Sequence, residues 1–106
     1  MDLLLKEKVV LITGGAKGIG AAIVRACAQE GAIPVIVGRD AEAGGHLQEE
    51  LRHAEMRCGL ITTELSAPEN CSKAVNETVT QFGRLDGLVN NAGRNDKVGL
   101  ESGNPA

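Results

Sequence analysis

The sequence predicts an α/β protein built around a parallel β-sheet that is covered on both faces. Short, continuously apolar runs alternate along the chain with segments of helical periodicity. Apolar runs without polar alternation are typical of strands buried on both faces of a parallel sheet. The length of 106 residues also fits one compact unit, so we expect a single sheet with its helices.

The first half of the chain contains two predicted strands separated by a helix. Residues 9–13 (VVLIT) and 34–37 (PVIV) are the apolar runs that predict the strands. The helix begins at Gly18 and ends before Gly31, which has the position of a C′ glycine. From the helical spacing we expect its apolar face to consist of Ile19, Ala22, Ile23, Ala26 and Cys27.

The second half repeats the alternation. A weaker helix is predicted over 43–54 and a strand over 58–62. The run Ser66-Ala67-Pro68-Glu69 resembles a capping box with proline in the first turn, so a third helix should follow it up to Gly83. A fourth strand is predicted over 85–90. The third helix carries one apolar stripe, made of Cys71, Ala74, Val75, Thr78, Val79 and Phe82.

Successive right-handed strand–helix–strand units place these strands in the order 3-2-1-4. This is one half of a doubly wound, Rossmann-type sheet plus the first strand of the other half. Residues 93–106 have three glycines, one proline and no periodicity, which predicts a loop. The loop ends at Asn104-Pro105-Ala106, a typical helix start with no helix after it. We therefore expect the chain to be a truncated part of a larger fold.

A glycine-rich segment, Thr13 to Gly20 (TGGAKGIG), joins the first strand to the first helix. The physical requirements are those of a dinucleotide-binding loop. Gly14 allows a sharp turn off the strand, Gly18 allows the backbone to approach a pyrophosphate, and Gly20 allows close packing of the helix on the sheet. The N–H groups of the first helical turn then face the phosphates. Residues 1–92 are thus predicted to be a dinucleotide-binding half-domain.

The residues after the second strand bear on the choice of nucleotide. A carboxylate at this place bonds the ribose 2′-OH of NAD, whereas an arginine accommodates the 2′-phosphate of NADP. The first residue past the predicted strand is Gly38, followed by Arg39 and Asp40. Lys17 in the glycine loop could supply a second cation to the phosphate. The sequence therefore favours NADP over NAD, and Asp40 keeps NAD as an alternative if the strand runs longer.

Composition excludes several other function classes. Eleven Lys and Arg against 14 Asp and Glu give a net charge of −3, which offers no attraction to nucleic acid or to an anionic membrane. Asp2, Lys6 and Glu7 interrupt the apolar N-terminus, and no apolar run approaches the roughly 20 residues of a membrane span. An odd number of cysteines without C-x-x-C spacing suits buried thiols in a reducing compartment, so we expect a cytoplasmic protein. His46 and His53 lack further metal ligands at suitable spacing, and no metal site is expected.

These residues resemble the short-chain dehydrogenase/reductase family. The resemblance rests on TGGAKGIG at 13–20, the GRD turn at 38–40 and NNAG at 90–93, in register with the predicted strands. It covers essentially the whole chain, but only the amino-terminal half of a family member. The segments GAIPVIVGRD and NNAGRNDKVGLESG look more loosely like the branch that oxidises free aldoses.

The resemblance implies roles for individual residues. The backbone of Asn90, Ala92 and Gly93 would pass the nicotinamide-side ribose, and the Asn90 side chain would tie the central strands together. Family members usually have Asp at the end of the third strand, next to the adenine. Here Glu64-Leu65 stands in its place, and the Leu65 backbone could serve. The cofactor-binding set expected from motif and resemblance together is Gly14, Lys17, Gly18, Ile19, Gly20, Arg39, Leu65, Asn90, Ala92 and Gly93.

The catalytic residues that the resemblance implies cannot be placed. The family uses a Tyr as general acid and base, a Lys four residues later and a Ser that polarises the carbonyl. The chain contains no Tyr, so we expect it to be inactive alone. Our leading hypothesis is the cofactor-binding half of an NAD(P)-dependent oxidoreductase acting on a carbonyl or alcohol substrate, with a sugar as one candidate and a homo-oligomeric parent. The alternatives are a truncated, non-catalytic nucleotide-binding or interaction module and, less favoured, an epimerase-like relative.

Overall fold

The computed structural model describes residues 5–64 and 68–91, which form a four-stranded parallel sheet with helices on both faces. The strands are β1 (Val9–Thr13), β2 (Ile33–Gly38), β3 (Gly59–Thr62) and β4 (Gly87–Asn90). The helices are α1 (Gly18–Gln29), α2 (Ala41–His53) and α3 (Pro68–Phe82). The sheet order is β3-β2-β1-β4 and all three strand pairs are parallel. The predicted fold class and strand order are therefore confirmed.

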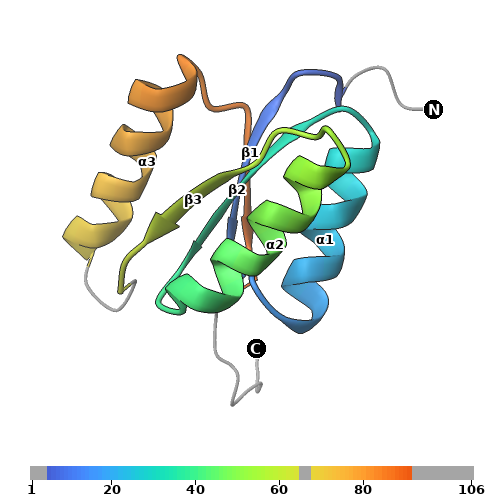
Figure 1. Cartoon of the computed structure of the whole chain (residues 1–106). Coiled ribbons are helices and arrows are strands. Elements are labelled where there is room, and N and C mark those ends of the chain that lie inside the picture. Colours follow the sequence, from blue (N-terminus) through green and yellow to red (C-terminus); the bar gives the residue numbers. More distant parts are fainter. Residues whose placement is uncertain (1–4, 65–67, 92–106) are drawn as a thin grey trace, which may run out of the picture.

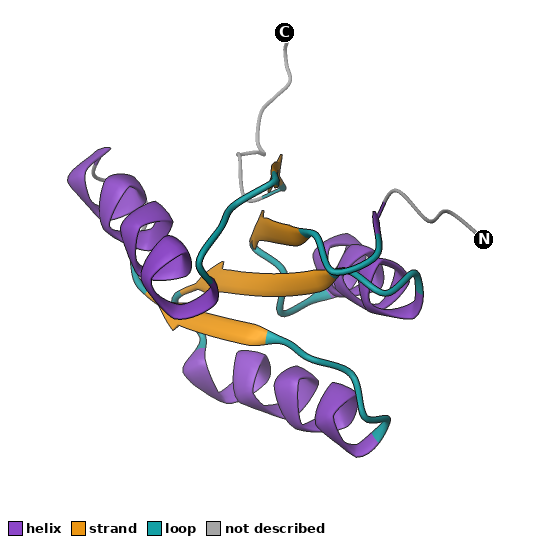
Figure 2. Ribbon diagram, turned by 90° about the horizontal axis from the view of Figure 1, so that it is seen from above, coloured by secondary structure: helices purple, strands orange, loops and turns teal. Residues whose placement is uncertain are grey.

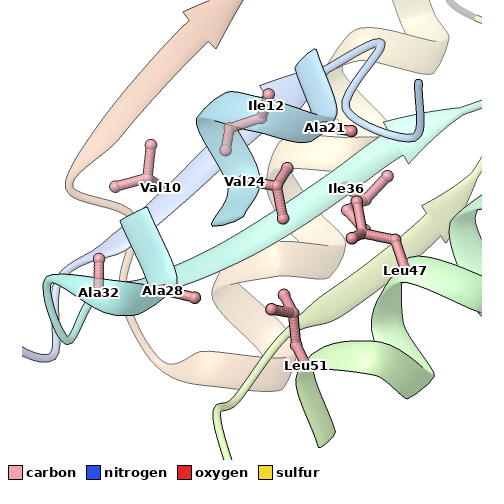
Figure 3. Close-up of a cluster of buried hydrophobic side chains, with 9 residues drawn as sticks. All are labelled: Val10, Ile12, Ala21, Val24, Ala28, Ala32, Ile36, Leu47 and Leu51. Atoms are coloured by element: carbon pink, nitrogen blue, oxygen red, sulfur yellow. The ribbon is translucent and has the colours of Figure 1, made fainter. Parts of the chain in front are cut away.

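The helices form two layers around the sheet. Helices α1 and α2 lie on one side and α3 lies on the other, as Figures 1 and 2 show from two directions. Successive side chains of a strand point to opposite faces, so each strand contributes to two separate cores. Figure 3 shows the core beneath α1 and α2, which contains Val10, Ile12, Ala21, Val24, Ala28, Ala32, Ile36, Leu47 and Leu51. The core beneath α3 contains Val9, Leu11, Ile33, Val35, Val37, Ile61 and Ala74.

The predicted apolar face of α1 is largely wrong, because Ile19, Ala22 and Ala26 are exposed. The residues buried against the sheet are Gly20, Ala21, Val24 and Ala28, whereas Ile19 is 74% exposed. Only Ile23 and Cys27 of the predicted face pack against the core, and both are half-buried. Small side chains allow the helix to lie close to the strands, so bulk is a poor guide to which face of this helix is buried.

The apolar stripe of α3 is also narrower than predicted. Ala74 and Thr78 are buried, but Cys71 is exposed and Val79 is 43% exposed. The helix covers β1 and β3 and does not cover β4, where Leu88 is 61% exposed. Leu88 lies beside Leu11 in the sheet, on the face that α3 packs against. Among residues 5–64 and 68–91, strand β4 is therefore paired with β1 alone and uncovered on that face.

Two residues just before β4, Arg84 and Asp86, help to fix the position of this strand on β1. The Asp86 carboxylate accepts a hydrogen bond from the Val9 N–H at 2.8 Å and pairs with Arg84 at 2.8 Å. The Arg84 guanidinium and the Val9 N–H hold the pKa of Asp86 below its usual value.

Several expectations fall outside the described residues. These are the capping residues Ser66 and Ala67, and the loop predicted over 93–106. Helix α3 does begin at Pro68, as expected after that cap. Within residues 5–64 and 68–91, no helix combines the length and the apolar character needed to cross a bilayer.

Candidate functional site

The sequence-predicted site residues that the structure describes lie along one edge of the sheet. The strands are parallel, so their carboxyl ends share an edge. The loop from Gly14 to Lys17 follows β1, Arg39 and Asp40 follow β2, Glu64 follows β3, and Asn90 ends β4. In doubly wound sheets this edge is where ligands bind.

The glycine loop has a geometry that residues with a side chain rarely adopt. Gly14 and Gly18 have φ angles of 66° and 56°, in the left-handed region that favours glycine. A Cβ at Gly20 would lie 2.0 Å from the carbonyl oxygen of Gly14. Gly20 thus allows the first turn of α1 to lie against the loop where β1 ends.

The N-terminus of α1 is directed at this edge. The first turn of any α-helix has N–H groups without intrahelical partners. Lys17 is the N-cap residue, and its side chain makes no capping hydrogen bond. A Cβ added at Gly18 would have no atom of the described residues within 4 Å. The arrangement leaves open space and N–H donors next to the loop, which suits an anionic phosphate group.

Three polar residues tie the end of β4 to the glycine loop. The Thr13 hydroxyl lies 3.1 Å from Asn90 Oδ1, to which it donates, and accepts from the Asn91 N–H at 2.9 Å. The Asn91 side chain donates to the Gly14 carbonyl at 3.2 Å. The Asn90 contact agrees with the role that the resemblance implied. Asn91 was missed, although its place beside Asn90 in the NNAG segment was the available signal.

A first ion pair joins the N-termini of α1 and α2. Lys17 Nζ lies 2.9 Å from Asp40 Oδ2. Asp40 is also the N-cap of α2, because its other carboxylate oxygen accepts the Ala43 N–H at 2.9 Å. The hydrogen bond from Ala43, followed by that from Lys17, lowers the pKa of Asp40 below its usual value.

A second ion pair links the ends of β2 and β3. Arg39 Nη1 lies 3.4 Å from Glu64 Oε2. The backbone under this pair is fixed, because the Thr63 N–H donates to the Gly38 carbonyl at 2.8 Å and the Asn70 side chain donates to the Glu64 carbonyl at 2.7 Å. Sequence reasoning singled out Arg39 but predicted neither its carboxylate partner nor that of Lys17.

Of the remaining predicted site residues, Ile19 is described by the structure and three others are not. Ile19 is an exposed residue in the first turn of α1, next to the loop. Leu65, Ala92 and Gly93 lie outside the described residues. Over residues 5–64 and 68–91, no group of three or more His, Cys, Asp or Glu side chains could hold a metal ion. Along the described part of this edge, Lys17 pairs with Asp40 and Arg39 pairs with Glu64.

Comparison with known proteins finds one family. The model of the family described as short chain dehydrogenase matches residues 8–105. L-fucose dehydrogenase of Oryctolagus cuniculus is 45% identical over 86 residues, which are 81% of this chain and 29% of that protein. Glucose and ribitol dehydrogenase homolog 2 of Arabidopsis thaliana is 40% identical over 104 residues, which are 92% of this chain and 36% of that protein.

Solved structures agree with the sequence comparison. A short chain dehydrogenase from Mycobacterium smegmatis superposes with a TM-score of 0.81 at 36% identity, covering 88% of this chain and 40% of that structure. The chain thus spans about a third of the length of the curated relatives described above.

Proposed function

This chain belongs to the short-chain dehydrogenase family, and we propose that it is the cofactor-binding part of an NAD(P)-dependent oxidoreductase. The observation that carries the proposal is the glycine loop between β1 and α1. Its left-handed Gly14 and Gly18, the Gly20–Gly14 contact and the open N-terminus of α1 together form a cradle for a pyrophosphate. A bound nicotinamide cofactor would supply or accept the hydride in the reaction of the whole protein.

We further propose that the cofactor is NADP. Lys17 and Arg39 are exposed cations at the edge where a 2′-phosphate would lie. The NAD alternative depends on Asp40. One oxygen of this carboxylate caps α2 and the other pairs with Lys17, so a ribose hydroxyl would have to compete for it. The two cations are also paired, but a 2′-phosphate competes for them with up to two negative charges, whereas a ribose hydroxyl competes for Asp40 with none. The charge of the ligand therefore favours the basic residues as the groups that recognise the ribose substituent.

The substrate class that we propose is a carbonyl or alcohol compound, with a free sugar as the leading example. The support is the similarity to L-fucose dehydrogenase and the sequence likeness to the aldose-oxidising branch. The chain has no Tyr to act as a phenolic proton donor. We therefore expect it to bind NADPH and NADP+ without oxidising L-fucose when NADP+ is supplied as the hydride acceptor, and turnover by the 106-residue chain would contradict this part of the proposal.

Calorimetric titration of the chain with NADPH and with NADH tests the cofactor proposal. We expect NADPH to bind more tightly, and we expect Lys17→Ala with Arg39→Ala to remove most of the difference. Gly18→Ala, which places a side chain at a positive φ beside the phosphates, should weaken both cofactors. Gly45→Ala is the matched control, because Gly45 lies in α2 with nothing within 4 Å of an added Cβ. Failure of the unmodified chain to bind either cofactor would refute the proposal.

A further inference from the structure

The basic residues at the carboxyl edge of the sheet already have carboxylate partners. We propose that Glu64 is a specificity-determining residue, which competes with the 2′-phosphate of NADP for Arg39 and so limits the preference for NADP over NAD. This inference rests on the proposed function, because it concerns the recognition of the same cofactor.

The position of Glu64 is set by the sheet. Gly38 and Thr62 are paired residues at the ends of β2 and β3, so the residues that follow them lie side by side. The Thr63 N–H bonds the Gly38 carbonyl, and the Asn70 side chain holds the Glu64 carbonyl. The backbone of Glu64 is thereby fixed next to Arg39, and its side chain reaches the guanidinium at 3.4 Å.

The local charge is balanced before any ligand arrives. Lys17 and Arg39 contribute two positive charges, and Asp40 and Glu64 contribute two negative charges. A 2′-phosphate therefore does not enter a positive site, and it must draw the cations away from carboxylates. It also carries up to two negative charges of its own, so any carboxylate left nearby repels it.

The two carboxylates differ in what they do once the cations turn to the phosphate. Asp40 keeps its capping hydrogen bond from the Ala43 N–H at 2.9 Å, and this N–H donor continues to compensate its charge. The Glu64 carboxylate loses the guanidinium contact and stays beside the incoming phosphate. Removal of the charge at Glu64 should therefore favour NADP, whereas the effect on NAD, which has no 2′-phosphate, should be small.

The solvent exposure of the Arg39 and Glu64 side chains limits how much Glu64 can change the binding of a 2′-phosphate. The Arg39 and Glu64 side chains are 76% and 54% exposed, so solvent screens the pair and its strength is modest. Loss of the competing pair together with relief of the repulsion should tighten binding of a 2′-phosphate by about three- to tenfold.

The test measures binding of 2′,5′-ADP and of 5′-AMP to the full chain by calorimetry. These probes carry the adenosine half of each cofactor, and only the first has a phosphate at the ribose 2′ position. We expect Glu64→Gln to tighten 2′,5′-ADP by about three- to tenfold and to change 5′-AMP by less than about twofold. Glu77→Gln is the matched control, because Glu77 is an exposed residue nine positions into α3, about 14 Å along the helix from its start.

A double variant separates the proposed route from a general charge effect. In the Arg39→Gln background, Glu64→Gln should lose most of its effect on 2′,5′-ADP, because the competition for the guanidinium is gone. An effect of Glu64→Gln that equals that of Glu77→Gln, or that is as large without Arg39 as with it, would overturn the inference and leave the proposed function standing. Binding of neither probe by any variant would overturn the proposed function and this inference with it.

Discussion

Substitution of Gly20 by alanine should damage both the stability of the chain and its glycine loop. The added Cβ would lie 2.0 Å from the Gly14 carbonyl oxygen, while real Cβ atoms keep at least 3.0 Å from other heavy atoms. The helix start or the loop must therefore move by about 1 Å, and the obstructing atom is backbone rather than a flexible side chain. Such overpacking costs about 1–3 kcal/mol, and we take about 3 kcal/mol because the backbone cannot rotate away. Better helix propensity returns up to about 1 kcal/mol, which leaves a net loss of about 2 kcal/mol.

Urea unfolding followed by far-UV circular dichroism measures this loss, since the chain has no Trp or Tyr for fluorescence. A loss of about 2 kcal/mol should lower the urea midpoint by roughly 1–2 M for a chain of this size. Gly45→Ala provides the matched control, because an added Cβ there meets nothing within 4 Å. This variant should gain about 0.5–1 kcal/mol from helix propensity alone. If Gly20→Ala unfolds at the same urea concentration as Gly45→Ala, the close contact between Gly20 and Gly14 does not exist in solution.

Three further predictions follow from burial and charge. Val24→Ala should destabilise the chain by about 2 kcal/mol and Ile19→Ala by less than about 0.5 kcal/mol, because Val24 is fully buried and Ile19 is 74% exposed. Equal urea midpoints of the two variants would contradict the buried face of α1 that the structure shows. Because the folded-state pKa of Asp86 is lowered, its contribution to stability is present above about pH 4 and is lost as the pH falls through the folded pKa. Asp86→Asn should then flatten the acid side of the stability profile, and an unchanged slope would count against this. Exposed Cys71 should react with iodoacetamide before Cys58, whose pKa burial raises to about 12; mass spectrometry of the labelled peptides gives the order.

The elements and their order were predictable because their signals are local and strong. Continuous apolar runs defined β1 within the bounds observed, and the helical periods gave the alternation that determines the topology. The buried face of α1 was not predictable from side-chain bulk. That helix approaches the sheet through Gly20, Ala21, Val24 and Ala28. Close packing of a helix on a sheet favours small side chains at the contact, so the buried residues are not the largest apolar ones.

The candidate site was predictable where the backbone geometry favours glycine. Glycine adopts the positive φ angles of positions 14 and 18 without the steric cost that a side chain brings. Ion pairs between residues of different loops leave no comparable pattern in the sequence. Lys17–Asp40 and Arg39–Glu64 join residues 23 and 25 positions apart, and nothing in the residue types alone specifies which charges meet. Asn91 was missed for the same reason, because its partner Gly14 lies 77 positions away.

The pairing of the first strand with the last one described has a kinetic consequence. Val9 and Asp86 are bonded across 77 positions, whereas β1 and β2 are separated by a single helix. Closing a longer loop costs more chain entropy, and contacts between distant residues slow folding. The β1–α1–β2 unit should therefore form first, with β4 joining it last. On unfolding, the order of these steps should reverse, so the backbone amides of β4 should exchange with deuterium before those of β2.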